Sequence, residues 1–155
     1  MKKHYLAAIA ITICTSFSCS AAPKDWVGKE LPKLTVDYIE KNPDLVGKPM
    51  IVEFWATWCP PCRASIPHLN EFNKKFKDKG LVVIGITDED KRDVVKFRKT
   101  VPMEYNVAID KGGKLSAQFG ISGIPQAFIV GKDGKIVWEG HPGSLTDAEI
   151  EKVLK

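Results

Sequence analysis

Short apolar runs recur along the chain and are separated by segments of helical spacing. Residues 50–56 (MIVEFWA) and 81–86 (LVVIGI) are almost continuously apolar, which is typical of strands buried on both faces. Residues 105–109, 126–130 and 135–139 are predicted to be further strands. The last two are joined by Gly-Lys-Asp-Gly, and Asp-Gly between two β runs is a strong hairpin signal.

The intervening segments have apolar residues three or four positions apart, as amphipathic helices do. From Pro60 to Lys77 this spacing predicts a long helix, and Gly80 ends it. A polar helix is predicted over residues 88–100 and a short one around residues 115–119. The last helix begins at a capping box, Thr-Asp-Ala-Glu, at residues 146–149.

The resulting order is β-α-β-α-β-α-β-β-α. Early alternation of strands and helices predicts parallel pairing, and the late hairpin adds antiparallel strands. Residues 23–49 are rich in Pro, Lys and Gly, with a short strand over residues 36–39. We therefore expect an α/β fold with a central mixed β-sheet flanked by helices, ending in a β-hairpin and a C-terminal helix.

Composition limits the classes of protein that this chain can represent. At 155 residues, 44% hydrophobic and 27% charged, it is an ordinary globular chain, and one domain over residues 22–155 is expected. The net charge of +4 is too small and too dispersed to indicate nucleic-acid binding. Four cysteines in this length do not make a disulfide-dense scaffold.

Residues 1–21 have the pattern of a secretory signal peptide. Two lysines precede an uncharged apolar run, and small residues follow it. We expect cleavage after Ala21; the alternative is a lipoprotein signal with Cys19 acylated. Both predict an exported protein in the periplasm or at the extracytoplasmic membrane face, where the glutathione pool does not keep thiols reduced.

The remaining cysteines, Cys59 and Cys62, flank Pro60 and Pro61 between a buried strand and a helix. Cys59 falls at or beside the helix N-cap, where free N–H groups and the positive helix end stabilise a thiolate. A stabilised thiolate has a lowered pKa and is the nucleophile at neutral pH. Cys62 is one helical turn further on, and the prolines suit the first turn. The sequence therefore predicts a reactive dithiol.

Two other interpretations of the pair fit the sequence less well. A zinc site needs two further ligands, and neither His68 nor His141 is paired at ligand spacing, so no metal site and no cofactor are expected. A purely structural disulfide closes only a two-residue loop and gains little from cross-linking. A peroxidase is disfavoured because no isolated cysteine follows residue 21 outside this pair.

Residues 53–63, EFWATWCPPCR, resemble the active-site signature of the thioredoxin superfamily. Gly123-Ile124-Pro125 resembles its second signature, a loop whose cis proline faces the dithiol, and Pro67 matches the proline that kinks the active-site helix. The resemblance covers roughly residues 31–155. With the N-terminal signal, the chain is most similar to the exported TlpA/ResA-type branch, which implies a thioredoxin-like fold and thiol–disulfide oxidoreductase activity.

The resemblance also implies a role for each reacting residue. Cys59 attacks a partner disulfide, and Cys62 then resolves the mixed disulfide. Glu53 matches the position of the buried acid in thioredoxin and is expected to take the proton from Cys62. The alternative for Glu53 is an edge or salt-bridged structural acid. Many members of the branch have another polar residue at this position.

Partner binding is expected around the dithiol. Pro125 keeps the backbone of its loop open to a partner strand, and Ile124 lies against the Cys59 sulfur. Trp58 is expected at the exposed rim beside Pro60 and Pro61. By contrast, His68 is expected to be a helix-surface residue and residues 89–92 a solvated helix start.

The branch reduces disulfides of exported partner proteins, such as apocytochromes or copper-site maturation factors. A membrane thiol reductant supplies the electrons, and the protein is expected to be a monomer. Two alternatives remain open: a net disulfide oxidant or isomerase of DsbA type, and a copper-handling thiol metallochaperone. The sequence lacks the Met/His cluster that a copper site would use.

Overall fold

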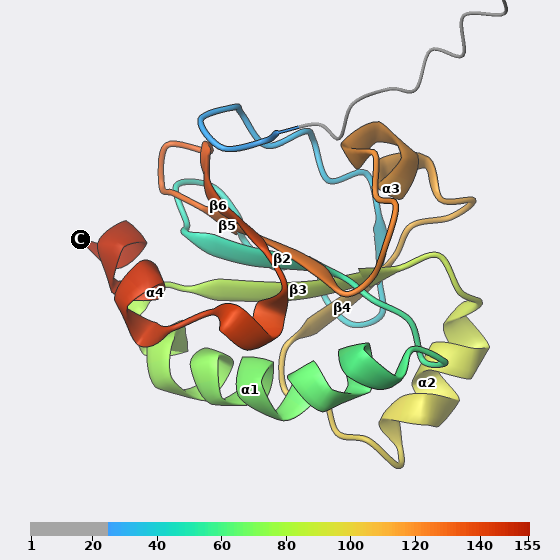
Figure 1. Ribbon diagram of the computed structural model, residues 1–155. Helices are drawn as coiled ribbons and strands as arrows, with labels where there is room; N and C mark the ends of the chain where they lie inside the picture. The colour runs from blue at the N-terminus through green and yellow to red at the C-terminus, as the bar shows by residue number, and fades with distance from the viewer. Residues whose placement is uncertain (1–24) are drawn as a thin grey trace, which may run out of the picture.

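The computed structural model describes residues 25–155, so the predicted signal peptide, its cleavage point and Cys19 lie outside the described residues. A six-stranded sheet with strand order β1-β4-β3-β2-β5-β6 forms the centre of the molecule (Figure 1). The strands are β1 (Asp37–Tyr38), β2 (Met50–Phe54), β3 (Val82–Thr87), β4 (Asn106–Ile109), β5 (Gln126–Val130) and β6 (Ile136–Gly140).

Helices cover both faces of this sheet (Figure 1). The helices are α1 (Pro60–Phe76), α2 (Lys91–Arg98), α3 (Lys114–Phe119) and α4 (Asp147–Leu154), with 3-10 turns η1 (Lys77–Lys79) and η2 (Pro142–Ser144). Buried residues of α1, α2 and α4 belong to one apolar cluster. Those of α3 pack with the N-terminal segment in the cluster on the opposite face.

The sheet is mixed, as predicted. Strands β2, β3 and β4 are parallel neighbours, whereas β5 and β6 form the antiparallel hairpin. β2 is central, paired with β3 on one side and β5 on the other. The chain therefore leaves the carboxyl end of a central strand and enters α1, so the start of α1 lies at the middle of the sheet's width.

Some boundaries differ from the predicted ones. β2 ends at Phe54 because the chain turns there, with Cys59 N–H donating to the Ala56 carbonyl at 3.2 Å. α2 begins at Lys91, three residues later than predicted, because the Asp90 side chain caps it by accepting the Arg92 N–H at 2.8 Å. The capping box of α4 is confirmed.

Apolar side chains fill both interfaces between sheet and helices. All five residues of β2 are buried, as predicted for a strand covered on both faces. Phe54 and Phe128 pack on Phe119 of α3, with ring centroids 5.1 and 4.9 Å away. Within residues 25–155, no helix combines the length and apolar character needed to cross a membrane.

Candidate active site

The two cysteines lie at the start of α1 and are joined by a disulfide. Their Cα atoms are 5.3 Å apart, and Cys59 is the N-cap of the helix. The Cys62 N–H donates to Cys59 Sγ at 3.3 Å. Pro60 and Pro61 occupy the first two helical positions, where no intrahelical donor is needed. A thiolate at Cys59 would accept the same N–H at the positive end of the helix, which favours the charged form.

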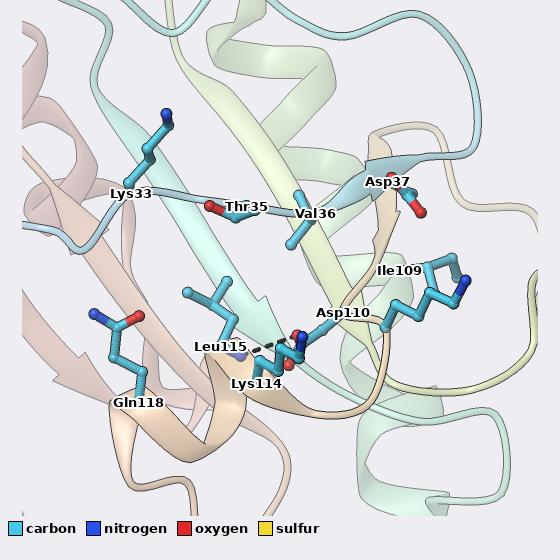
Figure 2. A pocket seen from close by; sticks show the side chains of 10 residues that line it. Lys33, Thr35, Val36, Asp37, Ile109, Asp110, Lys114, Leu115 and Gln118 are labelled. Atoms are coloured by element: carbon cyan, nitrogen blue, oxygen red, sulfur yellow. Dashed lines mark hydrogen bonds between the residues drawn. The ribbon is translucent and has the colours of Figure 1, made fainter.

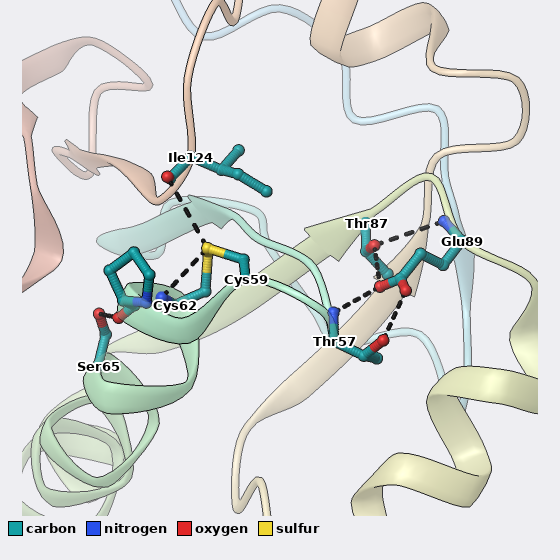
Figure 3. The surroundings of a disulfide bond; sticks show 8 residues. Thr57, Cys59, Cys62, Ser65, Thr87, Glu89 and Ile124 are labelled. Carbon is teal, nitrogen blue, oxygen red and sulfur yellow. Dashed lines mark hydrogen bonds between the residues drawn. A yellow bond between two sulfur atoms is a disulfide. The ribbon is translucent and has the colours of Figure 1, made fainter.

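A second loop faces the dithiol from across the sheet edge. The Ile124–Pro125 peptide bond is cis. The Ile124 carbonyl oxygen lies 3.8 Å from Cys59 Sγ (Figure 3). The two sequence motifs, 65 positions apart at these contacting residues, thus meet at one sulfur atom.

Exposure separates the aromatic residues around the dithiol. Trp58 is 70% exposed, as expected for a residue at the rim, whereas Trp55 is buried. Cys59 and Cys62 are both buried. The Trp55 ring packs 5.6 Å from Phe97 of α2. Trp58 is therefore the apolar side chain beside the disulfide that an incoming protein can contact.

A groove runs alongside the Ile124–Pro125 loop, next to Pro61. It has a volume of about 490 Å³. Its walls include apolar rings and two titratable side chains, namely Trp26, Phe119, Phe128, Glu139 and His141. Trp26 is held there by its ring N–H, which donates to the Phe119 carbonyl at 2.9 Å. The groove therefore lies beside the loop whose Ile124 carbonyl oxygen faces Cys59 Sγ.

Glu53 lies in the middle of β2 and is fully buried. Its neighbours across the sheet are both small, Gly85 on β3 and Ala127 on β5. By the alternation of β2, it faces the same side as Ile51 and Trp55, the side covered by α1. The sheet therefore leaves room for a carboxyl group beneath the active-site helix.

The surroundings of Glu53 disfavour its charge. Neither carboxyl oxygen has a hydrogen-bond partner among residues 25–155. Burial raises the pKa of Glu53 to about 8. Glu53 is not a salt-bridged structural acid, because none of the ion pairs among the described residues includes it. Glu53 is thus a neutral acid at pH 7 that can exchange a proton near neutrality.

Two side chains have contacts that the sequence did not predict. Glu89 is half-buried rather than solvated, and its carboxylate accepts hydrogen bonds from Thr57 (Figure 3). His68 is not a free surface residue, because its Nε2 lies 3.0 Å from the Leu145 carbonyl oxygen. Neither contact has a local sequence signal, since the partners are 32 and 77 positions away.

A second cavity, also of about 490 Å³, lies on the α3 face and is lined by Lys33, Lys111 and Lys114 (Figure 2). The Asp110 carboxylate beside it points to the first turn of α3, where it accepts the Leu115 N–H at 2.9 Å. Among residues 25–155, no group of three or more His, Cys, Asp or Glu side chains is arranged to hold a metal ion.

Known proteins with similar sequences include proteins named as thiol-disulfide oxidoreductases. The model of the AhpC/TSA family matches residues 27–139. The thiol-disulfide oxidoreductase ResA of Bacillus thuringiensis subsp. konkukian is 36% identical over 135 residues, which cover 83% of this chain and 77% of that protein.

Solved structures similar to this fold also belong to proteins named for thiol–disulfide exchange. A putative thiol:disulfide interchange protein DsbE from Chlorobium tepidum has 30% identity and a TM-score of 0.64, over 72% of this chain and 83% of that one. The C-terminal domain of a putative thiol-disulfide oxidoreductase from Bacteroides thetaiotaomicron has 25% identity and a TM-score of 0.73, over 83% of this chain and 95% of that one. The chain therefore belongs to the thioredoxin-like AhpC/TSA family, as a thiol–disulfide oxidoreductase similar to ResA.

Proposed function

We propose that this protein is exported and reduces disulfides of partner proteins through the Cys59/Cys62 dithiol. One observation supports the proposal above the others. Cys59 Sγ lies at the N-terminus of α1, accepts the Cys62 N–H, and is 3.8 Å from the carbonyl oxygen of Ile124, which lines a groove of about 490 Å³. A nucleophilic sulfur, a resolving sulfur and a peptide site are thus together.

The first step is attack on the partner. In the reduced protein, the Cys59 thiolate attacks one sulfur of the partner disulfide. A Cys59–partner S–S bond forms, the partner S–S bond breaks, and the departing partner thiolate takes a proton from solvent. The helix N-terminus makes this step available at neutral pH, because it stabilises the Cys59 thiolate.

The second step releases the reduced partner. Cys62 loses its proton and attacks Cys59 Sγ, so the Cys59–Cys62 bond forms as the mixed disulfide breaks. The second partner sulfur leaves as a thiolate, and two electrons have passed from the dithiol to the partner. We assign the ionised form of Glu53, which is the minor form at pH 7, as the proton acceptor for Cys62, since its pKa of about 8 matches the range in which a thiol ionises.

The partner segment lies in the groove beside Pro125. The Ile124–Pro125 loop pairs with the backbone of an extended partner segment, and Trp58 with Pro60 and Pro61 contacts it from the helix side. The partners are disulfide-containing exported proteins, such as apocytochromes or copper-site maturation factors, and a membrane thiol reductant restores the dithiol. Residues 1–21 supply export as a cleaved signal peptide or, in the alternative, as part of a lipoprotein signal that leaves Cys19 acylated.

Trapping of the mixed disulfide tests the proposal. A Cys62→Ala variant in the producing cells cannot resolve the intermediate, so exported disulfide proteins accumulate bound to Cys59. The Cys59→Ala/Cys62→Ala variant is the control and traps nothing. Absence of any Cys59-dependent adduct with an exported protein contradicts the function.

The reduction potential tests the direction of electron flow. A reductant has a potential closer to that of thioredoxin, about −270 mV, than to that of DsbA, about −120 mV. Equilibration with glutathione or dithiothreitol buffers measures it. A potential near the DsbA value would make the protein a net oxidant or isomerase instead.

A further inference from the structure

The loop that leads into the dithiol has few anchors of its own. It runs from the end of β2 at Phe54 to Cys59, and Trp58 within it is 70% exposed. Within the loop, the Cys59 N–H donates to the Ala56 carbonyl at 3.2 Å. At its start the loop is tied to β3, because the Trp55 N–H donates to the Ile86 carbonyl at 3.0 Å. Neither of these bonds holds the exposed part of the loop at Thr57 and Trp58.

A carboxylate two residues beyond the end of β3 anchors this part of the loop. The Glu89 carboxylate accepts the Thr57 backbone N–H at 2.7 Å with one oxygen and the Thr57 hydroxyl at 2.6 Å with the other. The two oxygens of the Glu89 carboxylate thus hold the backbone and the side chain of Thr57. Figure 3 shows this contact next to Cys59.

Glu89 is itself held in place by the sheet. The Thr87 hydroxyl donates to the Glu89 carboxylate at 3.1 Å. Thr87 is the last residue of β3 and is buried, so it is a rigid support. The chain of contacts therefore runs from the end of β3 through Glu89 to Thr57, two residues before the nucleophile.

We propose that Glu89 is a positioning residue for Cys59: its carboxylate holds the Thr57–Trp58 segment so that the sulfur meets a partner disulfide in line. The inference rests on the proposed function. Hydrogen bonds to a charged group are the stronger class, and both oxygens are used. An error of about 1 Å in placing a reacting atom costs up to about 100-fold in rate, so a loosened loop slows attack without removing the thiolate.

Paired variants separate positioning from charge. Thr57→Val removes the hydroxyl but leaves the carboxylate charge, whereas Glu89→Gln removes the charge and keeps the shape. Thr57→Ser retains the hydroxyl and is the rescue variant. Asp88→Asn is the matched control, because it removes one exposed negative charge from the same loop without contacting Thr57.

The experiment measures the second-order rate of the reduced protein with a peptide disulfide, the rate of Cys59 alkylation by iodoacetamide, and the melting temperature. We expect Thr57→Val and Glu89→Gln each to slow peptide-disulfide attack about tenfold. The double variant is about as slow as Glu89→Gln alone, because Thr57→Val removes one of the two hydrogen bonds that the Glu89 carboxylate accepts from Thr57. Iodoacetamide alkylation stays within about twofold, since it needs the thiolate, and a small reagent that is not docked on the protein can approach the sulfur from many directions. Thr57→Ser and Asp88→Asn behave as wild type.

Several results would overturn the inference. If Thr57→Val attacked the peptide disulfide at the wild-type rate, the hydroxyl contact would not position the loop. An equal loss of attack rate in Asp88→Asn would show that any negative charge in this loop has the effect. A loss of attack rate explained entirely by a smaller fraction of folded protein would show that Glu89 only stabilises the fold. The proposed function is judged separately, by whether the wild type reduces the peptide and Cys59→Ala does not.

Discussion

At the scale of single residues, two buried side chains have surroundings with opposite effects on a negative charge. Cys59 is at a helix N-terminus, which stabilises its negative charge, whereas Glu53 is among apolar neighbours, which destabilise a negative charge. After reduction of the disulfide, these environments favour the charged form of Cys59 and the neutral form of Glu53. Opposite environments for two groups are the usual basis for separate acid–base roles.

Glu53→Gln is expected to slow the resolving step about 100-fold, because the amide cannot accept the Cys62 proton. In the wild type, the resolving rate rises with pH through the Glu53 pKa of about 8, and this rise disappears in the variant. Stopped-flow reduction of a disulfide peptide across pH 5–9 measures both. Glu71→Gln, an exposed acid on α1, is the control. Superimposable profiles for Glu53→Gln and wild type would leave solvent as the base.

Alkylation of the reduced protein near pH 7 should modify Cys59 at least about tenfold faster than Cys62. The N-terminus of α1 and the Cys62 N–H stabilise the Cys59 thiolate, whereas Cys62 lies one turn inside the helix. Mass spectrometry of iodoacetamide-treated protein quantifies each site. Equal rates at the two cysteines would contradict the assignment of nucleophile and resolving thiol.

At the scale of elements, α3 is short and depends on a side chain for its placement. Asp110 is buried and accepts the Leu115 N–H, the Ser116 N–H and the Ser116 hydroxyl, at 2.9, 2.8 and 3.0 Å. Phe119, the last residue of α3, forms part of the groove wall beside Pro125. Asp110 therefore connects the end of β4 to the partner site.

Asp110→Ala is expected to lower the free energy of unfolding by about 2 to 4 kcal/mol, since buried N–H groups lose a charged acceptor. Reduction of a protein disulfide should slow more than reduction of a small disulfide such as cystine, because only the larger substrate uses the groove wall. Urea unfolding and parallel assays measure these effects. Asp88→Ala, an exposed substitution, is the control. A stability loss below about 0.5 kcal/mol would show that the cap is dispensable.

At the scale of the whole molecule, a buried acid makes stability depend on pH. Below pH 4.5 Glu53 is protonated in both the folded and the unfolded chain. Between pH 4.5 and about 8 the unfolded chain releases the proton and the folded chain keeps it, so stability falls as pH rises. At about 1.4 kcal/mol per pKa unit, the loss is on the order of 4 kcal/mol by pH 8.

Glu53→Gln is therefore expected to unfold at higher urea concentration than wild type at pH 8, and this gain is expected to shrink toward pH 5. Equilibrium unfolding of the oxidised proteins at both pH values measures the difference. The oxidised state is chosen so that cysteine ionisation does not contribute. A pH dependence shared equally by the wild type and Glu53→Gln would contradict a raised pKa for Glu53.

Much of the architecture was predictable from local patterns. The apolar runs identified β2 and β3, the three- to four-residue spacing identified α1, and Thr146 with Glu149 identified the start of α4. These features depend on neighbours within one or two turns of chain, so their physical cause is contained in a short window of sequence. The boundaries of β2 and α2 were less accurate, because turns and side-chain caps end those elements.

A dithiol that opens a helix after a buried strand was predictable from the sequence alone, because helix capping and strand burial are local properties. The tertiary structure decided which distant groups surround it. Only folding brings Ile124 to Cys59 and joins Glu89 to Thr57. It also places Glu53 between Gly85 and Ala127, where its carboxyl group has no hydrogen-bond partner among residues 25–155. The physical reason is that contacts between segments depend on strand order and on packing across the sheet, which no single segment encodes.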